Sequence, residues 1–282
     1  MIYYENCNGT RMDLDKWPAV IDDITELYGK EWKYEATKNA TANRTKLERF
    51  YRTGISKKIT LQIYADTEKE YCEILNQLSE ITDIDIIEQT PGKIWVGDYY
   101  LECFITELEP KEYDDIFYTV DVDATIEAFT PYWINKDTYT FHSYGISSNN
   151  NKRYPKRYGY RYANGMSSNY IINPHYTAAN FELIVYGPVI NPQVAIGTNT
   201  YLVNVVLEEG EYLRINSRDR TITKVLRNGE QVNAYHNRQK GREFFRKIQP
   251  GRQMIQWTGK FDFDLIIYEE RSEPKWNVYQ AH

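Results

Sequence analysis

The second half of the sequence alternates short apolar runs with turn residues at close intervals. Runs such as FELIVYGP, QVAIG and KFDFDLIIYEE have the composition of β-strands. Turn pairs such as Asn228–Gly229 and Pro250–Gly251 lie between these runs. Strands spaced about 8–12 residues apart, with no helical pattern between them, indicate a β-sandwich over residues 176–282.

The first half, residues 1–134, mixes strands with helical patterns. KKITLQIYA and IFYTVDVDATIEAFTPYW both alternate apolar and polar residues, which is typical of half-buried strands. The spacing of apolar residues predicts a helix near 67–81, capped by Asp66 or Thr67. The spacing in DLDKWPAVIDDITELY predicts a second helix over 13–28. The chain as a whole is therefore expected to be mainly β.

The distribution of charged residues also divides the chain near residue 134. Residues 1–134 hold 14 Lys and Arg against 27 Asp and Glu, whereas residues 135–282 hold 20 against 13. This asymmetry indicates two domains with different neighbours. Residues 135–175 are polar and rich in Tyr, Gly and Pro, which is typical of a linker.

Within this expected linker, the stretch RYPKRYGYRY interleaves basic and aromatic residues. Such interleaving is found in grooves that bind single-stranded nucleic acid. However, the stretch is short, the chain is acidic overall, and the stretch lies at the change in composition between the two domains. We favour a linker or interface role over nucleic-acid binding. The candidate residues are Tyr154, Pro155, Tyr158, Gly159, Tyr160 and Tyr162.

Motifs for catalysis and for cofactors are lacking in the sequence. No nucleophile motif, glycine-rich phosphate loop or zinc-binding spacing is present. The pairs Asp121/Asp123 and Asp262/Asp264 have a spacing that a glycosidase could use, but each pair lies opposite an apolar strand face, where acids keep a strand soluble. We therefore expect no enzyme activity, no cofactor and no metal.

Three widely spaced cysteines indicate a reducing compartment. Neither a secretion signal nor an apolar run of membrane-spanning length is visible, so we expect no membrane association. Tyrosine is unusually frequent, at 26 of 282 residues. Because Tyr contributes large, rigid contact area at interfaces, this frequency predicts a homo-oligomer.

Several stretches, taken in order, resemble the distal tail proteins (Dit) of long-tailed phages and prophages. In the second half these are FELIVYGPVINP, EGEYLRINSRDRTI, NGEQVN, FFRKIQPG and ERSEPKW. Asn216 and Arg220 depart mildly from the pattern of the second stretch. The first half contributes the weaker matches DLDKWP, YGKEWKYE and FTPYW.

The resemblance implies a structural hub at the tail tip, or baseplate, of a siphovirus. The N-terminal domain would close a hexameric ring that joins the tail tube to the tail-associated hub or lysin protein, with DNA passing through the lumen. A C-terminal galectin-like sandwich would hold receptor-binding or other tip proteins. The protein would be located in the virion, after assembly in the host cytoplasm.

The resemblance also implies an alternative function for the sandwich and a role for two residues near the end of the chain. A galectin-like sandwich could bind sugars, so a carbohydrate-binding adhesin is the alternative. Pro274 and Trp276, near the end of the chain, would close the C-terminal domain, with Trp276 as a buried anchor.

Overall fold

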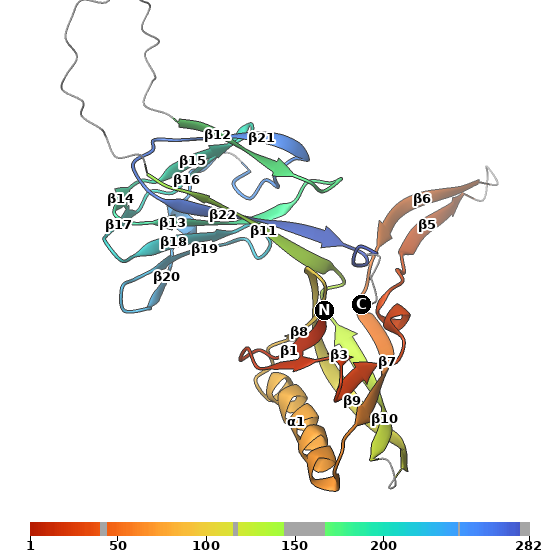
Figure 1. Cartoon of the computed structure of the whole chain (residues 1–282). Coiled ribbons are helices and arrows are strands. Elements are labelled where there is room, and N and C mark those ends of the chain that lie inside the picture. The colour runs from red at the N-terminus through yellow and green to blue at the C-terminus, as the bar shows by residue number, and fades with distance from the viewer. Residues whose placement is uncertain (40–43, 115–117, 144–166, 242, 277–282) are drawn as a thin grey trace, which may run out of the picture. The chain divides into compact units, whose positions relative to one another are not determined.

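The computed structural model describes residues 1–39, 44–114, 118–143, 167–241 and 243–276. The chain divides into two compact units: unit 1 comprises Met1–Asn135 and Glu270–His282, and unit 2 comprises Lys136–Glu269. Strands predominate in both units, and Figure 1 shows the long helix α1 in unit 1. This confirms the prediction of a mainly β chain.

Unit 1 is built from antiparallel strands, the helix α1 and one short 3₁₀ helix. Its elements are β1 (Ile2–Glu5), β2 (Arg11–Asp13), β3 (Asp15–Lys16), β4 (Ala19–Ile21), the 3₁₀ helix (Ile24–Leu27), β5 (Lys33–Asn39), β6 (Arg44–Tyr51), β7 (Ile55–Tyr64), α1 (Glu68–Ile87), β8 (Gly92–Val96), β9 (Tyr99–Asp114), β10 (Thr119–Ala128) and the first residues of β11 (Trp133–Phe141).

The long strand β9 takes part in two groups of strands. Its first residues pair with β8, which continues to β1 and β2. The rest of β9 pairs with β10, which continues to β7, β4 and β3. Val120, Val122, Ala124 and Ile126 of β10 are all buried, as their alternation predicted. These strands and α1 together enclose the core of unit 1.

Helix α1 confirms the expected helix and extends it. The Thr67 hydroxyl accepts a hydrogen bond from the Glu70 amide (3.3 Å), so Thr67 is the N-cap. Tyr71, Ile74, Leu78 and Ile81 are buried on one face of the helix, against the core. The helix continues six residues past Ile81, to Ile87.

The helix expected over 13–28 is wrong. The segment forms β3, β4 and a 3₁₀ helix of four residues. Ala19 and Ile21 are buried with the half-buried Val20 between them, and Ala19 and Ile21 lie opposite Ile63 and Leu61 of β7. Pairing with β7 therefore overrides the helical spacing, and Trp17, placed by that spacing on the apolar face, is exposed.

Unit 2 consists of two antiparallel sheets and a two-stranded pair. Its elements are the rest of β11, β12 (Ser167–Asn173), β13 (Asn180–Tyr186), β14 (Val189–Ile190), β15 (Gln193–Ile196), β16 (Asn199–Leu202), β17 (Val206–Leu207), β18 (Tyr212–Asn216), β19 (Thr221–Val225), β20 (Gln231–Asn233), a 3₁₀ helix (Tyr235–Asn237), β21 (Gly251–Trp257) and β22 (Phe263–Arg271).

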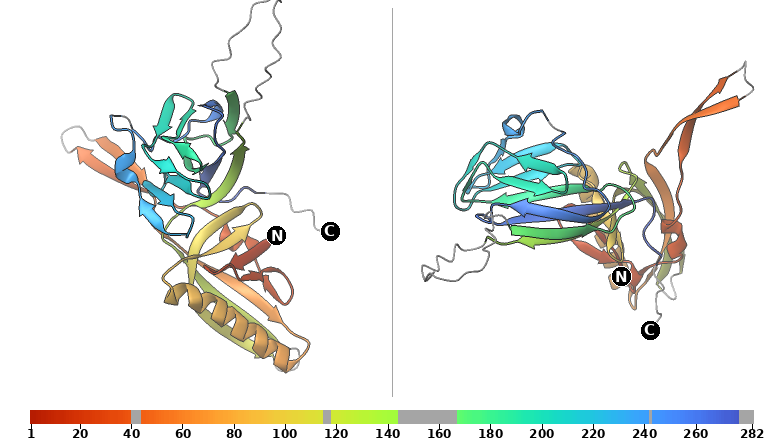
Figure 2. Two further views of the ribbon diagram at one scale, coloured as in Figure 1. Left: turned by 90° about the vertical axis from the view of Figure 1, so that its left-hand side faces the viewer. Right: turned by 90° about the horizontal axis from the view of Figure 1, so that it is seen from above.

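The two sheets of unit 2 form a sandwich. One sheet has the order β20-β19-β18-β13-β22-β11, and the other has the order β12-β21-β15-β16. Alternate residues of both sheets meet in one core, in which the Phe263 ring stacks on Phe141 (4.6 Å) and meets Trp257 edge-on (5.2 Å). The sandwich is seen from two further directions in Figure 2.

The chain passes between the units inside strands. It leaves unit 1 at Asn135, within β11, and returns at Glu270, within β22. The segment 144–166 lies outside the described residues, and the strands before and after it, β11 and β12, both contribute to unit 2. This differs from the expected linker at 135–175, because part of that range forms strands of the sandwich.

Candidate assembly surface

Strands β5 and β6 form a two-stranded hairpin that projects from unit 1. We call residues 33–51 the arm, and Figures 1 and 2 show it extending away from the other strands of unit 1. β5 pairs only with β6 among the described strands, and the pairing runs from Lys33–Tyr51 to Asn39–Arg44. Nearly every described side chain of the arm is exposed.

One face of the arm is apolar. Tyr34 lies opposite Phe50, and Ala36 lies opposite Leu47 beyond a bulge. The Tyr34 and Phe50 rings meet edge-on at 6.3 Å, yet the two side chains are 65% and 58% exposed. On the other face, Arg49 and Glu35 form a bidentate ion pair with both N–O distances at 2.8 Å.

A hairpin with these properties is expected to have a partner. An isolated two-stranded hairpin is only marginally stable in water, and adjacent exposed aromatic residues are a feature of protein interfaces. The bidentate Arg49–Glu35 pair stabilises the hairpin but covers none of the apolar face. The arm is therefore a surface of unit 1 suited to bind another protein.

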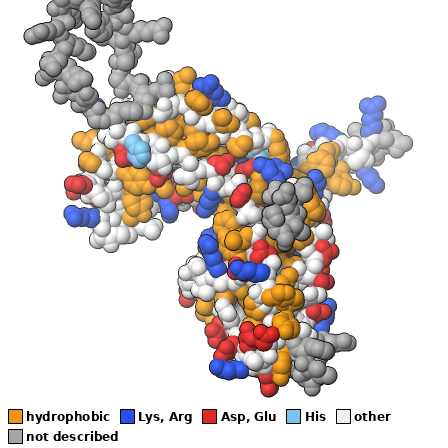
Figure 3. All heavy atoms as spheres, viewed as in Figure 1, with side chains coloured by type: hydrophobic (Ala, Val, Ile, Leu, Met, Phe, Trp, Pro, Cys, Tyr) orange, Lys and Arg blue, Asp and Glu red, His pale blue; other side chains and the backbone are white. Residues whose placement is uncertain are grey.

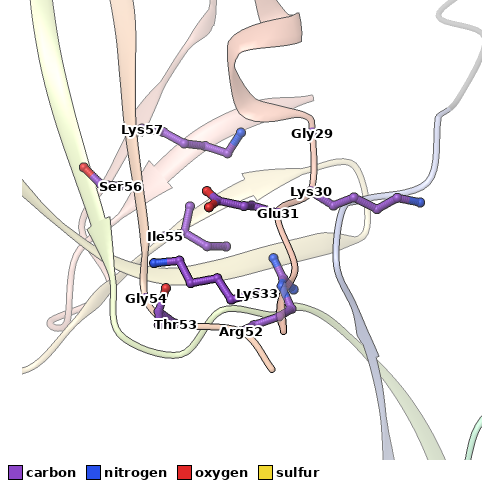
Figure 4. A pocket seen from close by; sticks show the side chains of 10 residues that line it. All are labelled: Gly29, Lys30, Glu31, Lys33, Arg52, Thr53, Gly54, Ile55, Ser56 and Lys57. Carbon is purple, nitrogen blue, oxygen red and sulfur yellow. The ribbon is translucent and has the colours of Figure 1, made fainter. Parts of the chain in front are cut away.

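A polar cavity of 260 Å³ lies at the base of the arm (Figure 4). Its lining residues come from the segment before β5, from the first residue of β5, from the turn between β6 and β7, and from the first three residues of β7. Four of the residues are basic, namely Lys30, Lys33, Arg52 and Lys57, and one is acidic, Glu31. In Figure 4, Lys30 points away from the other labelled side chains.

Arg52 and Lys57 are held by backbone carbonyl groups. The Arg52 guanidinium donates to the carbonyls of Pro131 and Ser272, whereas its buried Nε has no hydrogen-bond partner. The Lys57 ammonium donates to the carbonyls of Glu26 (3.1 Å) and Tyr28. Burial lowers the pKa of Arg52 and of Lys57, because it disfavours their charged forms.

The C-terminal strap, residues 270–276, reaches the same base. Glu273 lies 3.9 Å from the Lys30 ammonium, and the Trp276 ring stacks on Tyr28 at 3.8 Å. Arg52 contacts the strap through the Ser272 carbonyl at 3.4 Å. Aromatic stacking and charge-assisted hydrogen bonds thus connect the strap to the residues from which the arm extends.

The sequence-predicted site residues are only partly within the described structure. Tyr154, Pro155, Tyr158, Gly159, Tyr160 and Tyr162 lie outside the described residues. Pro274 is buried and Trp276 is 62% exposed, and both belong to unit 1. This differs from the expected buried anchor of the sandwich, because the strap leaves β22 and packs on Tyr28.

Three of the four acids in the two pairs bond to neighbouring side chains or backbone. Asp123 pairs with Lys111 at 2.7 Å and accepts a hydrogen bond from Thr60. Asp262 accepts from the Ser143 amide, and Asp264 accepts from the Tyr186 hydroxyl. Each of these acids thus has a structural partner.

Within the described residues, no group of three or more His, Cys, Asp or Glu side chains is placed to hold a metal ion. None of the helices among them is both long and apolar enough to span a membrane.

Sequence reasoning missed the arm. WKYEATKNATANRTKLERFY is mostly polar, and its alternation of Tyr34, Ala36, Leu47 and Phe50 is interrupted by a bulge and by the polar residues in the middle of the stretch. The distribution of charged residues did distinguish this segment, however. Residues 28–58 contain nine of the 14 Lys and Arg of residues 1–134, but only three of their 27 acids.

Comparison with known proteins gives matches at the level of structure. No protein-family model matches the sequence, and no curated protein matches it. The chain is similar in structure to the Dit protein of phage SPP1, described as a paradigm of the hub adsorption apparatus in phages that infect Gram-positive bacteria. The TM-score is 0.61 at 8% identity, over 96% of this chain and 99% of that chain.

Two further similar structures are chains of the phage P2 baseplate in its activated conformation. The chain from the baseplate with calcium has a TM-score of 0.63 at 14% identity, over 97% of this chain and 98% of that one. The chain from the baseplate with strontium has a TM-score of 0.62 at 13% identity, over 97% and 100%. The similarity spans both units, so this chain has the fold of the SPP1 Dit protein and of the matched P2 baseplate chains.

Proposed function

We propose that the chain is a structural component of the tail tip of a long-tailed phage, where unit 1 of several copies closes a ring. The arm carries this proposal, because it exposes an apolar face away from its own unit. The shared fold with the SPP1 Dit protein and the P2 baseplate chains supports a location at the tail tip.

In the ring, the arm of each copy binds unit 1 of the next copy. Such a contact is heterologous, because it joins two different surfaces of the same chain, and its repetition closes a ring when the rotation fits. Six copies are expected from the resemblance to distal tail proteins. The ring joins the tail tube on one side to the tail-associated hub or lysin protein on the other.

DNA passes through the ring but does not bind to it. Residues 1–134 carry 27 acids against 14 basic residues, so the unit that forms the ring is strongly acidic. Like charges repel the phosphate backbone and keep the duplex from adhering to the lumen. The role is structural, and we assign no catalytic residues.

Unit 2 presents its sandwich to receptor-binding or other tip proteins. Its core is independent of the core of unit 1, so it can carry a partner without any change in the residues that close the ring. Assembly takes place in the host cytoplasm, where Cys7, Cys72 and Cys103 stay free, as they are in the structure. Carbohydrate binding by the sandwich remains a prediction, which a glycan array tests.

Multi-angle light scattering over a wide concentration range tests this proposal. We expect the chain to assemble at high concentration, or when the tail-tube protein is added. In the sample without tube protein, the assembled mass should be a multiple of the monomer mass of 33.5 kDa. A monomer at every concentration, with and without the tube protein, would contradict the proposal.

A further inference from the structure

The cavity at the base of the arm is positively charged and incompletely neutralised. Lys33, Arg52 and Lys57 line it, and Glu31 is its one acidic lining residue. Within the described part of the chain, no ion pair joins Lys33, Glu31 or Lys57 to an opposite charge. Arg52 and Lys57 bond to carbonyl oxygens, which carry no full charge.

Partly buried cations without a bonded carboxylate favour an anion in the cavity. Taking a charge out of water is costly unless an opposite charge is placed next to it. Arg52 and Lys57 are half-buried, and this burial lowers the pKa of each side chain because it disfavours the charged form unless an anion lies nearby. Lys33 is an exposed lining residue of the cavity, so its ammonium can bind an incoming group directly.

The rest of unit 1 supplies the matching charge. Outside residues 28–58, residues 1–134 contain 24 acids and only five Lys or Arg. Helix α1 carries several of these acids on its exposed side, and Lys69 is its one basic residue; the exposed acids are Glu68, Glu70, Glu73, Glu80 and Asp83. Figure 3 shows basic side chains along the arm and acidic ones over the part of unit 1 that contains α1.

We propose that the cavity at the base of the arm binds a carboxylate from the exposed face of α1 in the adjoining copy of the chain. The basic and the acidic surfaces lie on different parts of one unit, so they can meet only between copies, head to tail. This inference rests on the ring proposed above. It adds the pair of surfaces that fixes the register, which is the alignment of each copy against the next. Complementary charges fix the register and exclude wrong contacts.

Cross-linking of the assembled full-length chain tests the pairing of surfaces. Equal amounts of unlabelled and nitrogen-15-labelled chain are assembled and treated with a carbodiimide, which joins a lysine amine directly to a carboxylate in contact with it. We expect mixed-isotope peptide pairs that link Lys33 to an acid of Glu68–Ile87. Links from Lys33 to other acids, or no link between copies, would overturn the inference.

A charge reversal provides a second test. Lys33→Glu should raise the concentration needed for assembly by about tenfold or more, equivalent to about 1.4 kcal/mol. Lys240→Glu is the matched control, because it makes the same charge change at an exposed residue of unit 2 and should leave assembly unchanged. Lys33→Glu should not alter the thermal unfolding of the monomer, since Lys33 is exposed.

The two proposals fail in different ways. If the wild-type chain stays monomeric even with the tube protein, the ring itself is wrong. If the wild type assembles and Lys33→Glu assembles equally well, only the carboxylate pairing is wrong.

Discussion

Asp85 is a fully buried carboxylate that connects α1 to the N-terminal strand. Its Oδ2 accepts a hydrogen bond from the Tyr4 hydroxyl at 2.5 Å, and its Oδ1 accepts from the Cys7 amide at 2.7 Å. Gly92 leaves room for this contact, because a Cβ there would lie 2.4 Å from both Asp85 Oδ2 and the Tyr4 hydroxyl. The helical spacing of α1 did not predict this cluster, because the partners of Asp85 come from distant parts of the sequence.

Asp85→Ala should destabilise unit 1 strongly. The change leaves the buried Tyr4 hydroxyl without its acceptor, at a cost of about 1–3 kcal/mol, and it also removes the acceptor of the half-buried Cys7 amide. Urea unfolding measures this loss, with Asp83→Ala as the control. Asp83 is exposed on the same helix, so its change should cost less than about 0.5 kcal/mol. Equal stability of the two variants would refute the assigned role of Asp85.

Glu211 makes the stability of unit 2 depend on pH. The Glu208 backbone amide and the Lys224 ammonium, both 2.7 Å from its carboxylate, lower the pKa of Glu211 below its usual 4.5. Because its pKa is lower in the folded than in the unfolded state, Glu211 stabilises unit 2 at pH values above its unfolded pKa. This stabilisation is lost as the pH falls through the folded pKa.

Glu211→Gln should therefore flatten the decline of stability below pH 4.5, the usual pKa of the residue. Hydrogen exchange of the β18 amides across this pH range measures the effect. Glu209→Gln, a change at an exposed neighbour, is the control. An unchanged decline in Glu211→Gln would show that the two hydrogen bonds do not stabilise the fold.

Among the elements, those with a clear alternation were predictable from the sequence. β7 and β10 follow the expected strands because alternate residues of each lie in the core. The segment 13–28 was not predictable, because strands of two and three residues are too short to show a period and are fixed by pairing with β7. The arm was not predicted because its apolar alternation is interrupted by a bulge and lies in a mostly polar stretch.

Tyr34→Ser with Phe50→Ser should separate assembly from folding. Both side chains are exposed in the single chain, so thermal unfolding should change little, whereas assembly should be lost because the apolar face is removed. Tyr176→Ser, at an exposed aromatic residue of unit 2, is the control for light scattering. Normal assembly of the double variant would exclude the arm as the interface.

Trp276→Ala should loosen the strap. Loss of the stack on Tyr28 should cost about 0.5–1.5 kcal/mol and should speed hydrogen exchange near residues 28–30. The sandwich core should keep its exchange rates, because Trp276 belongs to unit 1. Faster exchange in β21 or β22 alone would instead support the sequence-based expectation that Trp276 closes the sandwich.

For the molecule as a whole, the order of the matching stretches along the sequence predicted the fold better than any single residue did. The ordered stretches predicted a Dit-like chain, and the structural similarity to SPP1 Dit and the P2 baseplate chains confirms that fold at 8–14% identity. The assembly surface was less accessible to sequence reasoning. Its parts, Lys33, Arg52, Lys57 and the strap, come from separate stretches and meet only after folding.

Electron microscopy of the purified chain mixed with its tail-tube protein tests the central claim most directly. Class averages should show closed rings with six-fold symmetry, built from unit 1, with unit 2 outside the ring. The same images of the Tyr34→Ser, Phe50→Ser variant should show no rings. Single particles without rotational symmetry in the wild-type sample, at every concentration and with the tube protein present, would contradict a ring-forming tail-tip protein.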